Sequence, residues 1–365
     1  MQYGPEMSND KDQNTMINAK PVENWLFLSA FMVLAMAVIG AVTRLTESGL
    51  SMVEWRPLVG MIPPLNDADW TRVFDLYRDT PEFAHKNSWM ELADFKAIFF
   101  WEWLHRFWGR MIGIVYALPL LYFWVRKQIP RGYGFKLLVG LLLGGAQGLM
   151  GWYMVKSGLI DRPSVSHYRL AAHLSLAFLI FGYLLWLAFD LQSLNNRNKK
   201  NCIPRENGDL KTIEKDSRFR GKNKNELFCL KRHSWITMFF VCTTIIWGAF
   251  VAGLDGGMVY NSWPLMGGHL VPPDVTGLSS LHVNPAAVQF FHRWIAVITG
   301  CVALSFAWRV KSYVLALAIF LQIGLGLTTL LTQVFLPVAA LHQAGAFFIF
   351  AAMIYQLQGL HKKAA

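Results

Sequence analysis

Hydrophobic residues recur along the chain in eight long runs that are separated by polar segments. A helix of about 20 residues crosses the roughly 30 Å hydrocarbon core of a bilayer. The pattern therefore predicts an all-α polytopic membrane protein with eight transmembrane helices, at 23–43, 97–125, 135–155, 168–190, 235–254, 286–308, 313–332 and 337–360.

The positions of Lys and Arg orient these helices in the membrane. The two tails and the connections on their side hold more than twice as many Lys and Arg residues as the connections on the other side. Basic residues collect in cytoplasmic segments of membrane proteins. We therefore expect both termini in the cytoplasm of a bacterial inner membrane.

The composition agrees with this class. Hydrophobic residues make up 54% of the chain, which is too apolar for an ordinary soluble domain. The net charge of +11 comes from basic inter-helix segments without interleaved aromatic residues, so we expect the lipid bilayer and not nucleic acid as the partner. Two of the four cysteines fall inside apolar runs and two in a basic segment, so neither a disulfide nor a CxxC metal site is expected.

The chain repeats itself on either side of a basic polar segment. Motifs recur in the same order, with GAVTRLTESGLSMVEW (40–55) matched by GAFVAGLDGGMVYNSW (248–263) and FFWEWLHR (99–106) by VQFFHR (288–293). Each half ends on the side where it began, which predicts two parallel, pseudo-symmetric four-helix bundles. The expected parts are a cytoplasmic tail, an N-terminal four-helix repeat, a basic cytoplasmic linker and a C-terminal four-helix repeat, at 1–22, 23–190, 191–234 and 235–361.

Four of the ten histidines fall inside apolar helices, two in each repeat: His105, His173, His292 and His342. Each lies a few residues from the outer end of its helix, which places all four in one layer roughly 8–12 Å deep. Imidazoles on facing helices suit axial ligation of a haem iron. A single histidine of this kind can be a packing residue, but four in one layer are hard to explain that way. A bare zinc or copper site fits less well, because few carboxylate or sulfur ligands accompany them.

An acid distinguishes the two repeats. Glu102 precedes His105 by three residues, on the same helix face, whereas Gln289 takes the matching position before His292. Ionisable groups at membrane depth are costly and usually functional, so Glu102 is a candidate for handling protons during chemistry. The alternative is that Glu102 only forms an ion pair with Arg106, four residues further on.

Arginines near the outer ends of the same helices are candidates for binding haem propionates: Arg106, Arg169 and Arg293. Snorkelling of these side chains to lipid headgroups is an equally good explanation. Arg169 stands four residues before His173 on its face, which makes it the best candidate of the three.

The outer segment before the second predicted helix carries two local signals. Trp70, Val73, Phe74 and Tyr77 have amphipathic helical spacing, which suits a short helix lying on the membrane or packing against the bundle. Ser88 and Glu91 have the form of a capping box that starts the second transmembrane helix. Asn284 and Pro285 are the expected cap and first residue of the sixth.

The combination of EWLHR (102–106), RLAAHL (169–174), FFHRW (290–294) and LHQAGA (341–346) with both loop motifs resembles the haem A synthase family over roughly residues 23–360. The resemblance implies oxidation of a methyl group of haem O to a formyl group, which gives haem A for terminal oxidase assembly, with a b-type haem as cofactor. It implies that His105 and His173 face the substrate haem, that Glu102 is catalytic, and that His292 and His342 ligate haem b. The absence of outer cysteines resembles the branch found in proteobacteria and mitochondria.

Two other functions remain open at this point. A di-haem membrane cytochrome that transfers electrons from quinol would use both halves alike, and a haem transporter or chaperone would ligate haem reversibly. The sequence leaves open the electron-transfer partner, the source of the oxygen atom, docking of a haem O synthase and the formation of a homo-oligomer.

Overall fold

The computed structural model describes residues 18–54, 59–158, 164–201, 222–275 and 281–364, and within them it is helical without strands. The prediction of eight apolar helices long enough to cross a membrane is confirmed. They are α1 (Lys20–Leu45), α3 (Leu92–Val125), α4 (Gly134–Gly158), α5 (His167–Asn201), α6 (Lys224–Gly253), α7 (Pro285–Arg309), α8 (Tyr313–Leu331) and α9 (Leu336–Ala364).

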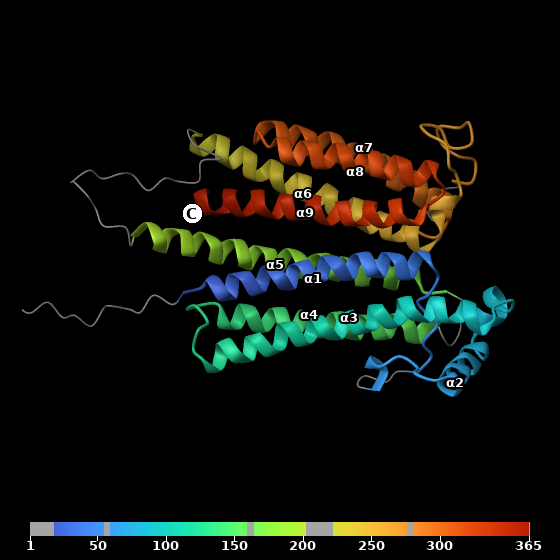
Figure 1. Ribbon diagram of the computed structural model, residues 1–365. Coiled ribbons are helices and arrows are strands. Elements are labelled where there is room, and N and C mark those ends of the chain that lie inside the picture. Colours follow the sequence, from blue (N-terminus) through green and yellow to red (C-terminus); the bar gives the residue numbers. More distant parts are fainter. Residues whose placement is uncertain (1–17, 55–58, 159–163, 202–221, 276–280, 365) are drawn as a thin grey trace, which may run out of the picture.

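The helices run side by side in two sets of four. One set consists of α1, α3, α4 and α5, and the other of α6 to α9 (Figure 1). The sets meet where α1 packs against α9 and α5 packs against α6 and α9. At this contact the rings of Phe178 and Phe347 stack with centroids 3.8 Å apart, inside the main hydrophobic core. The start of α1 and the end of α9 lie at the same end of the bundle (Figure 1).

Two of the long helices extend into the segment predicted as a linker. α5 continues to Asn201 and α6 begins at Lys224, so helix occupies both ends of 191–234. The middle of that segment, 202–221, and most of the N-terminal tail, 1–17, lie outside the described residues.

Short elements cover the opposite end of the first set. They are the 3-10 turn η1 (Val59–Met61), α2 (Asp67–Arg78) and the π-helical turn η2 (Phe83–Asn87). α2 is the predicted amphipathic helix, and it packs against α3: the ring centroids of Trp70 and Phe99 are 5.1 Å apart, and those of Tyr77 and Phe95 are 5.2 Å apart. This favours packing on the bundle over lying on the lipid surface. In the second set, η4 (Gly256–Met258) follows α6.

One predicted helix start is confirmed and one is wrong. Asn284 caps α7 by accepting hydrogen bonds from the N–H groups of Ala286 and Ala287. Ser88 does not cap α3, because its backbone is α-helical at the end of η2 (φ −59°, ψ −17°), whereas an N-cap needs an extended backbone. Glu91 is the N-cap, with φ −98° and ψ 172°, and its own N–H donates to the Asp94 carboxylate at 3.1 Å.

Glu82, next to η2, makes the stability of this outer cover depend on pH. Its side chain is 4% exposed, and burial raises the pKa of its carboxyl from 4.5 to about 7. The folded protein therefore keeps a proton that the unfolded chain has lost. The stabilisation from this group is complete below about pH 4.5 and is lost as the pH rises through 7, by about 3 kcal/mol in all.

We expect the thermal unfolding temperature of the purified protein to fall between about pH 5 and about pH 8 by more than in Glu82→Gln, whose amide does not titrate. Because the other carboxyl groups are the same in both proteins, the difference between the two falls isolates Glu82. Equal falls in both proteins would contradict the assignment.

Candidate functional site

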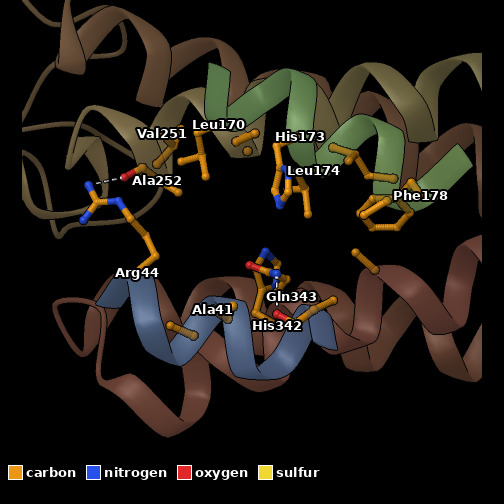
Figure 2. Close-up of a pocket in the computed structure, with 18 of the residues that line it drawn as sticks. Ala41, Arg44, Leu170, His173, Leu174, Phe178, Val251, Ala252, His342 and Gln343 are labelled. Carbon is orange, nitrogen blue, oxygen red and sulfur yellow. Dashed lines mark hydrogen bonds between the residues drawn. The ribbon is translucent and has the colours of Figure 1, made fainter. Parts of the chain in front are cut away.

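A cavity of about 1820 Å³ is lined by both sets of helices and by all four predicted histidines. Its volume exceeds the roughly 1,000 Å³ at the upper end of ordinary small-molecule pockets, so it suits one or two large ligands. Figure 2 shows His173 on α5 and His342 on α9 projecting into the same hollow. The structure thus brings together the histidines that the sequence singled out.

Each of these histidine rings lies against a glycine on the transmembrane helix before it. A Cβ atom added to any of the four glycines would come within 3.2 Å of the facing ring, closer than side chains normally pack. The glycines therefore provide the space in which the imidazoles lie. The pairs are Gly40 with His105, Gly151 with His173, Gly248 with His292 and Gly326 with His342.

The histidines also associate within each half. His105 lies within electrostatic range of His173, and His292 within range of His342. The rings of His292 and His342 lie beside the backbone of Thr244 and Gln322. The Nδ1 atom of His173 is buried and has no hydrogen-bond partner. Buried nitrogens of this kind are costly unless a ligand engages the ring, so the donor set fits a group that binds imidazole.

Haem fits this donor set better than a bare metal ion does. Among the described residues, no three His, Cys, Asp or Glu side chains come together as a metal cluster. The histidines instead occur two to a half along a wide cavity, and a porphyrin supplies the remaining iron ligands itself.

Two glutamines that the sequence analysis missed contact these histidines. The Nε2 atom of Gln147 donates to the backbone carbonyl of His173 at 3.1 Å and lies 3.2 Å from the ring Nε2 atom. Gln322 donates to the carbonyl of His342 at 2.9 Å. Each glutamine precedes by four residues the glycine that faces the same histidine. The spacing Q-x-x-x-G inside two apolar runs was the signal that could have revealed them.

The carboxylate of Glu102 is firmly bound inside the first half, where its residue is 2% exposed. Oε1 accepts from the guanidinium of Arg106, so the predicted ion pair is present. Oε2 accepts from the Ser51 hydroxyl and from the Met52 N–H, both at 2.7 Å. Glu102 therefore ties α3 to the loop that follows α1.

The second half has a matching connection of different chemistry. In the first half, Arg106 donates to the carbonyls of Met52 and Glu54. In the second half, Arg293 donates to the carbonyls of Tyr260 and Ser262. Tyr260 and Ser262 occupy the positions of Met52 and Glu54 in the aligned loop motifs. Beside these arginines, Glu102 accepts a hydrogen bond from its loop. Gln289 instead donates one, from Nε2 to the Tyr260 carbonyl at 2.9 Å. The two halves thus share a framework and differ in one charge.

The structure separates the three arginines that were predicted to bind propionates. Arg106 and Arg293 line the cavity, and the buried Nε atom of Arg293 has no hydrogen-bond partner, which leaves a donor for an anion. Arg169 does not line the cavity: its guanidinium lies 3.9 Å from the ring centroid of Tyr153 and donates to that residue's carbonyl.

A fourth arginine, Arg44, was not predicted but lines the cavity. It binds the Asp255 carboxylate at 2.7 Å, and it donates to the Ala252 carbonyl at 2.8 Å (Figure 2).

Known proteins match the chain over nearly its whole length. The model of the cytochrome oxidase assembly protein family COX15-CtaA matches residues 23–354. The heme A synthase of Rhodospirillum centenum is 43% identical over 360 residues, which cover 94% of this chain and 90% of the relative. The heme A synthase of Paramagnetospirillum magneticum is 41% identical, with 94% and 95% covered. That of Wolbachia pipientis subsp. Culex pipiens is 38% identical, with 95% and 100% covered.

The family match reaches all eight transmembrane helices and includes every lining residue of the cavity, from Ser29 to Ile349. The chain belongs to the haem A synthase family.

Proposed function

We propose that this protein oxidises the methyl group of haem O to the formyl group of haem A, the form of haem that is supplied to terminal oxidases. Membership of the haem A synthase family gives the reaction. The site is assigned from one cavity that is lined by four histidines, two from each half, each packed against a glycine. Only the pair in the first half has an acid beside it, Glu102.

The two halves have different roles in this proposal. His105 and His173 face the substrate haem, and His292 and His342 hold a b-type haem, which supplies one-electron redox chemistry when bound. The difference between Glu102 and Gln289 supports this division, because only the first half offers a carboxylate at this position beside its histidines. The unpartnered Nε of Arg293 is the best-supported contact for a propionate of the second haem.

Glu102 is the proposed catalytic carboxylate of the substrate half. Its position one helical turn before His105 puts it at the same wall of the cavity, and both residues line that wall. Its three donors fix the carboxylate in place, which is the preorganisation that a charge needs to stabilise a reacting group. Arg106, in turn, positions Glu102 rather than reaching for the substrate.

The protein is a multi-pass membrane protein. We further propose that it lies in the bacterial inner membrane with both termini in the cytoplasm, so that the histidine layer is near the outer face. Two observations support this orientation: the excess of Lys and Arg on the side of the tails, and the location of the start of α1 and the end of α9 at one end of the bundle (Figure 1).

A di-haem electron carrier is the second candidate, and extracted pigment separates the two. The enzyme should copurify with haem O or haem A beside haem b, whereas the carrier should contain haem b alone. A haem transporter should lose its pigment on purification.

Glu102→Gln removes the charge while keeping the shape of the side chain. We expect haem A formation to fall by about 100-fold or more, the usual effect of removing a preorganised group that stabilises charge at the reacting centre. Haem b content should stay at the wild-type level, since Gln occupies the matching position in the second half. Mass analysis of extracted haems measures both quantities, and normal haem A in this variant would remove the catalytic role.

His292→Ala should deplete haem b, because it removes one of the two imidazoles of that half, while substrate haem remains bound. His105→Ala is the matched variant in the first half and should leave haem b in place. Reduced-minus-oxidised absorption spectra of the purified variants measure haem b. Haem b lost from His105→Ala and retained in His292→Ala would mean that the halves are assigned the wrong way round.

Gly326→Ala tests the close approach of glycine to histidine. Its new Cβ would lie 2.9 Å from the His342 ring, so the ring must shift and haem b should be bound several-fold less tightly. Gly324→Ala, two residues earlier on α8, is the control, because its Cβ would meet nothing within 4 Å. Haem b retained equally by both variants would show that the ring is free to move.

A further inference from the structure

A second buried carboxylate, Glu82, lies at the outer end of the cavity and has no part in the reaction described above. It lines the same cavity as Glu102, and its residue is only 4% exposed. It stands between α2 and η2, outside the membrane-spanning helices. A buried acid that faces a reaction cavity is a candidate for a functional group.

The two carboxylates of the cavity are bound very differently. Glu102 accepts hydrogen bonds on both oxygens, from a guanidinium, a hydroxyl and a backbone N–H. Glu82 has one hydrogen-bond donor among the described residues, the Tyr77 hydroxyl at 3.2 Å. Asn87 in turn donates to that hydroxyl at 2.6 Å and so directs its proton toward Glu82. The Glu102 carboxylate is thus held by three donors, whereas the Glu82 carboxyl group has a single donor and can take up and release a proton without breaking a network of hydrogen bonds.

The charged neighbours of Glu82 do not compensate for its burial. Lys86 on η2 attracts a negative charge on Glu82, but it forms its ion pair with Glu47, at 3.0 Å. Glu47, after α1, and Glu102, on α3, repel a negative charge on Glu82. Burial, the largest effect, raises the pKa of Glu82 to about 7, so both of its protonation states are populated near neutral pH.

Water reaches the cavity beside this acid. Lys86 and Glu47 line the cavity, and their side chains are nevertheless 32% and 44% exposed. They therefore mark the place where the cavity meets the outer aqueous phase. Glu82 lines the same cavity and interacts electrostatically both with Lys86 and Glu47 at this opening and with Glu102. It is therefore close enough to both to exchange protons between them.

We propose that Glu82 exchanges protons between the substrate half of the cavity and the outer aqueous phase, while Glu102 remains the fixed anion. In each exchange the Glu82 carboxylate takes a proton from the cavity and releases it to outer water, or the reverse, and no electrons move. The inference rests on the proposed function, because oxidising a methyl group to a formyl group removes carbon-bound hydrogen in an apolar site. Glu82 acts through the site and does not touch the reacting carbon.

The experiment is the pH profile of haem A formation by the purified, haem-loaded protein and three variants. The wild type should show an inflection near pH 7. In Glu82→Gln the inflection should disappear and the rate should fall about tenfold or more at the wild-type optimum, with unchanged haem content. In Tyr77→Phe it should move to higher pH, because the Tyr77 hydrogen bond lowers the pKa of Glu82. Asp75→Asn, an exposed acid on the same helix as Tyr77, is the control and should behave as wild type.

Infrared titration gives a second measurement that does not depend on turnover. A carbonyl-stretch band of a protonated carboxyl should vanish as the pH rises through about 7 in the wild type and be absent from Glu82→Gln. A wild-type rate and profile in Glu82→Gln, or the same infrared band in both proteins, would overturn the proposal. If the wild type binds haem but forms no haem A, the proposed function fails, and the infrared titration still decides whether Glu82 exchanges a proton near neutrality.

Discussion

Polar groups at membrane depth must find partners within the protein, and this constraint organises the whole bundle. Arg106 and Arg293 satisfy it by donating to loop carbonyls, and Glu102 by accepting from its loop. The outer loops are thereby fastened onto the helices that carry the first histidine of each half. Against this background, buried nitrogens of two residues that line the cavity, His173 Nδ1 and Arg293 Nε, have no hydrogen-bond partner and are candidates for engaging a ligand.

The recurrence of the same contacts in both halves explains how one framework can hold two similar ligands. Equivalent glycines face equivalent histidines, and equivalent glutamines bind the histidine carbonyls on α5 and α9. At one matching position the first half has Glu102 and the second half has Gln289. Glu102 accepts a hydrogen bond where Gln289 donates one, and it brings a negative charge to the first half. Such a difference leaves ligand binding possible in both halves but gives only one of them a group that can serve chemistry.

Much of this was predictable from the sequence, because the responsible signals are local. The length of each apolar run fixes a transmembrane helix, and the spacing of Asn284 and Pro285 fixes the start of α7. Four histidines were identifiable because an imidazole in an apolar run is rare. The start of α3 at Leu92 was not predictable from Ser88, because η2 continues helical geometry up to that residue.

The features that escaped the sequence depend on distant contacts. The location of Arg169 against Tyr153 depends on how α4 packs on α5, and the bond from Arg44 to Asp255 joins residues of different halves. Gln147 and Gln322 share the Q-x-x-x-G spacing, but their hydrogen bonds to the histidine carbonyls of the next helix follow only from how the helices pack.

Glu82 shows most clearly why a site needs tertiary structure to be recognised. In sequence it is one of several acids in a polar outer segment, and it lacks the capping-box spacing that marks Glu91. Folding gives three of these carboxyl groups different surroundings: Asp75 stays exposed near Arg78, Glu91 caps a helix, and Glu82 is buried at the cavity with one weak donor. When two carboxyl groups of one cavity differ this much in their bonding, they are suited to different tasks. Glu102, which accepts three hydrogen bonds, is suited to hold a negative charge in place, and Glu82, which accepts one, is suited to gain and lose a proton. An oxidation that needs a fixed charge and a proton carrier would find both in this cavity.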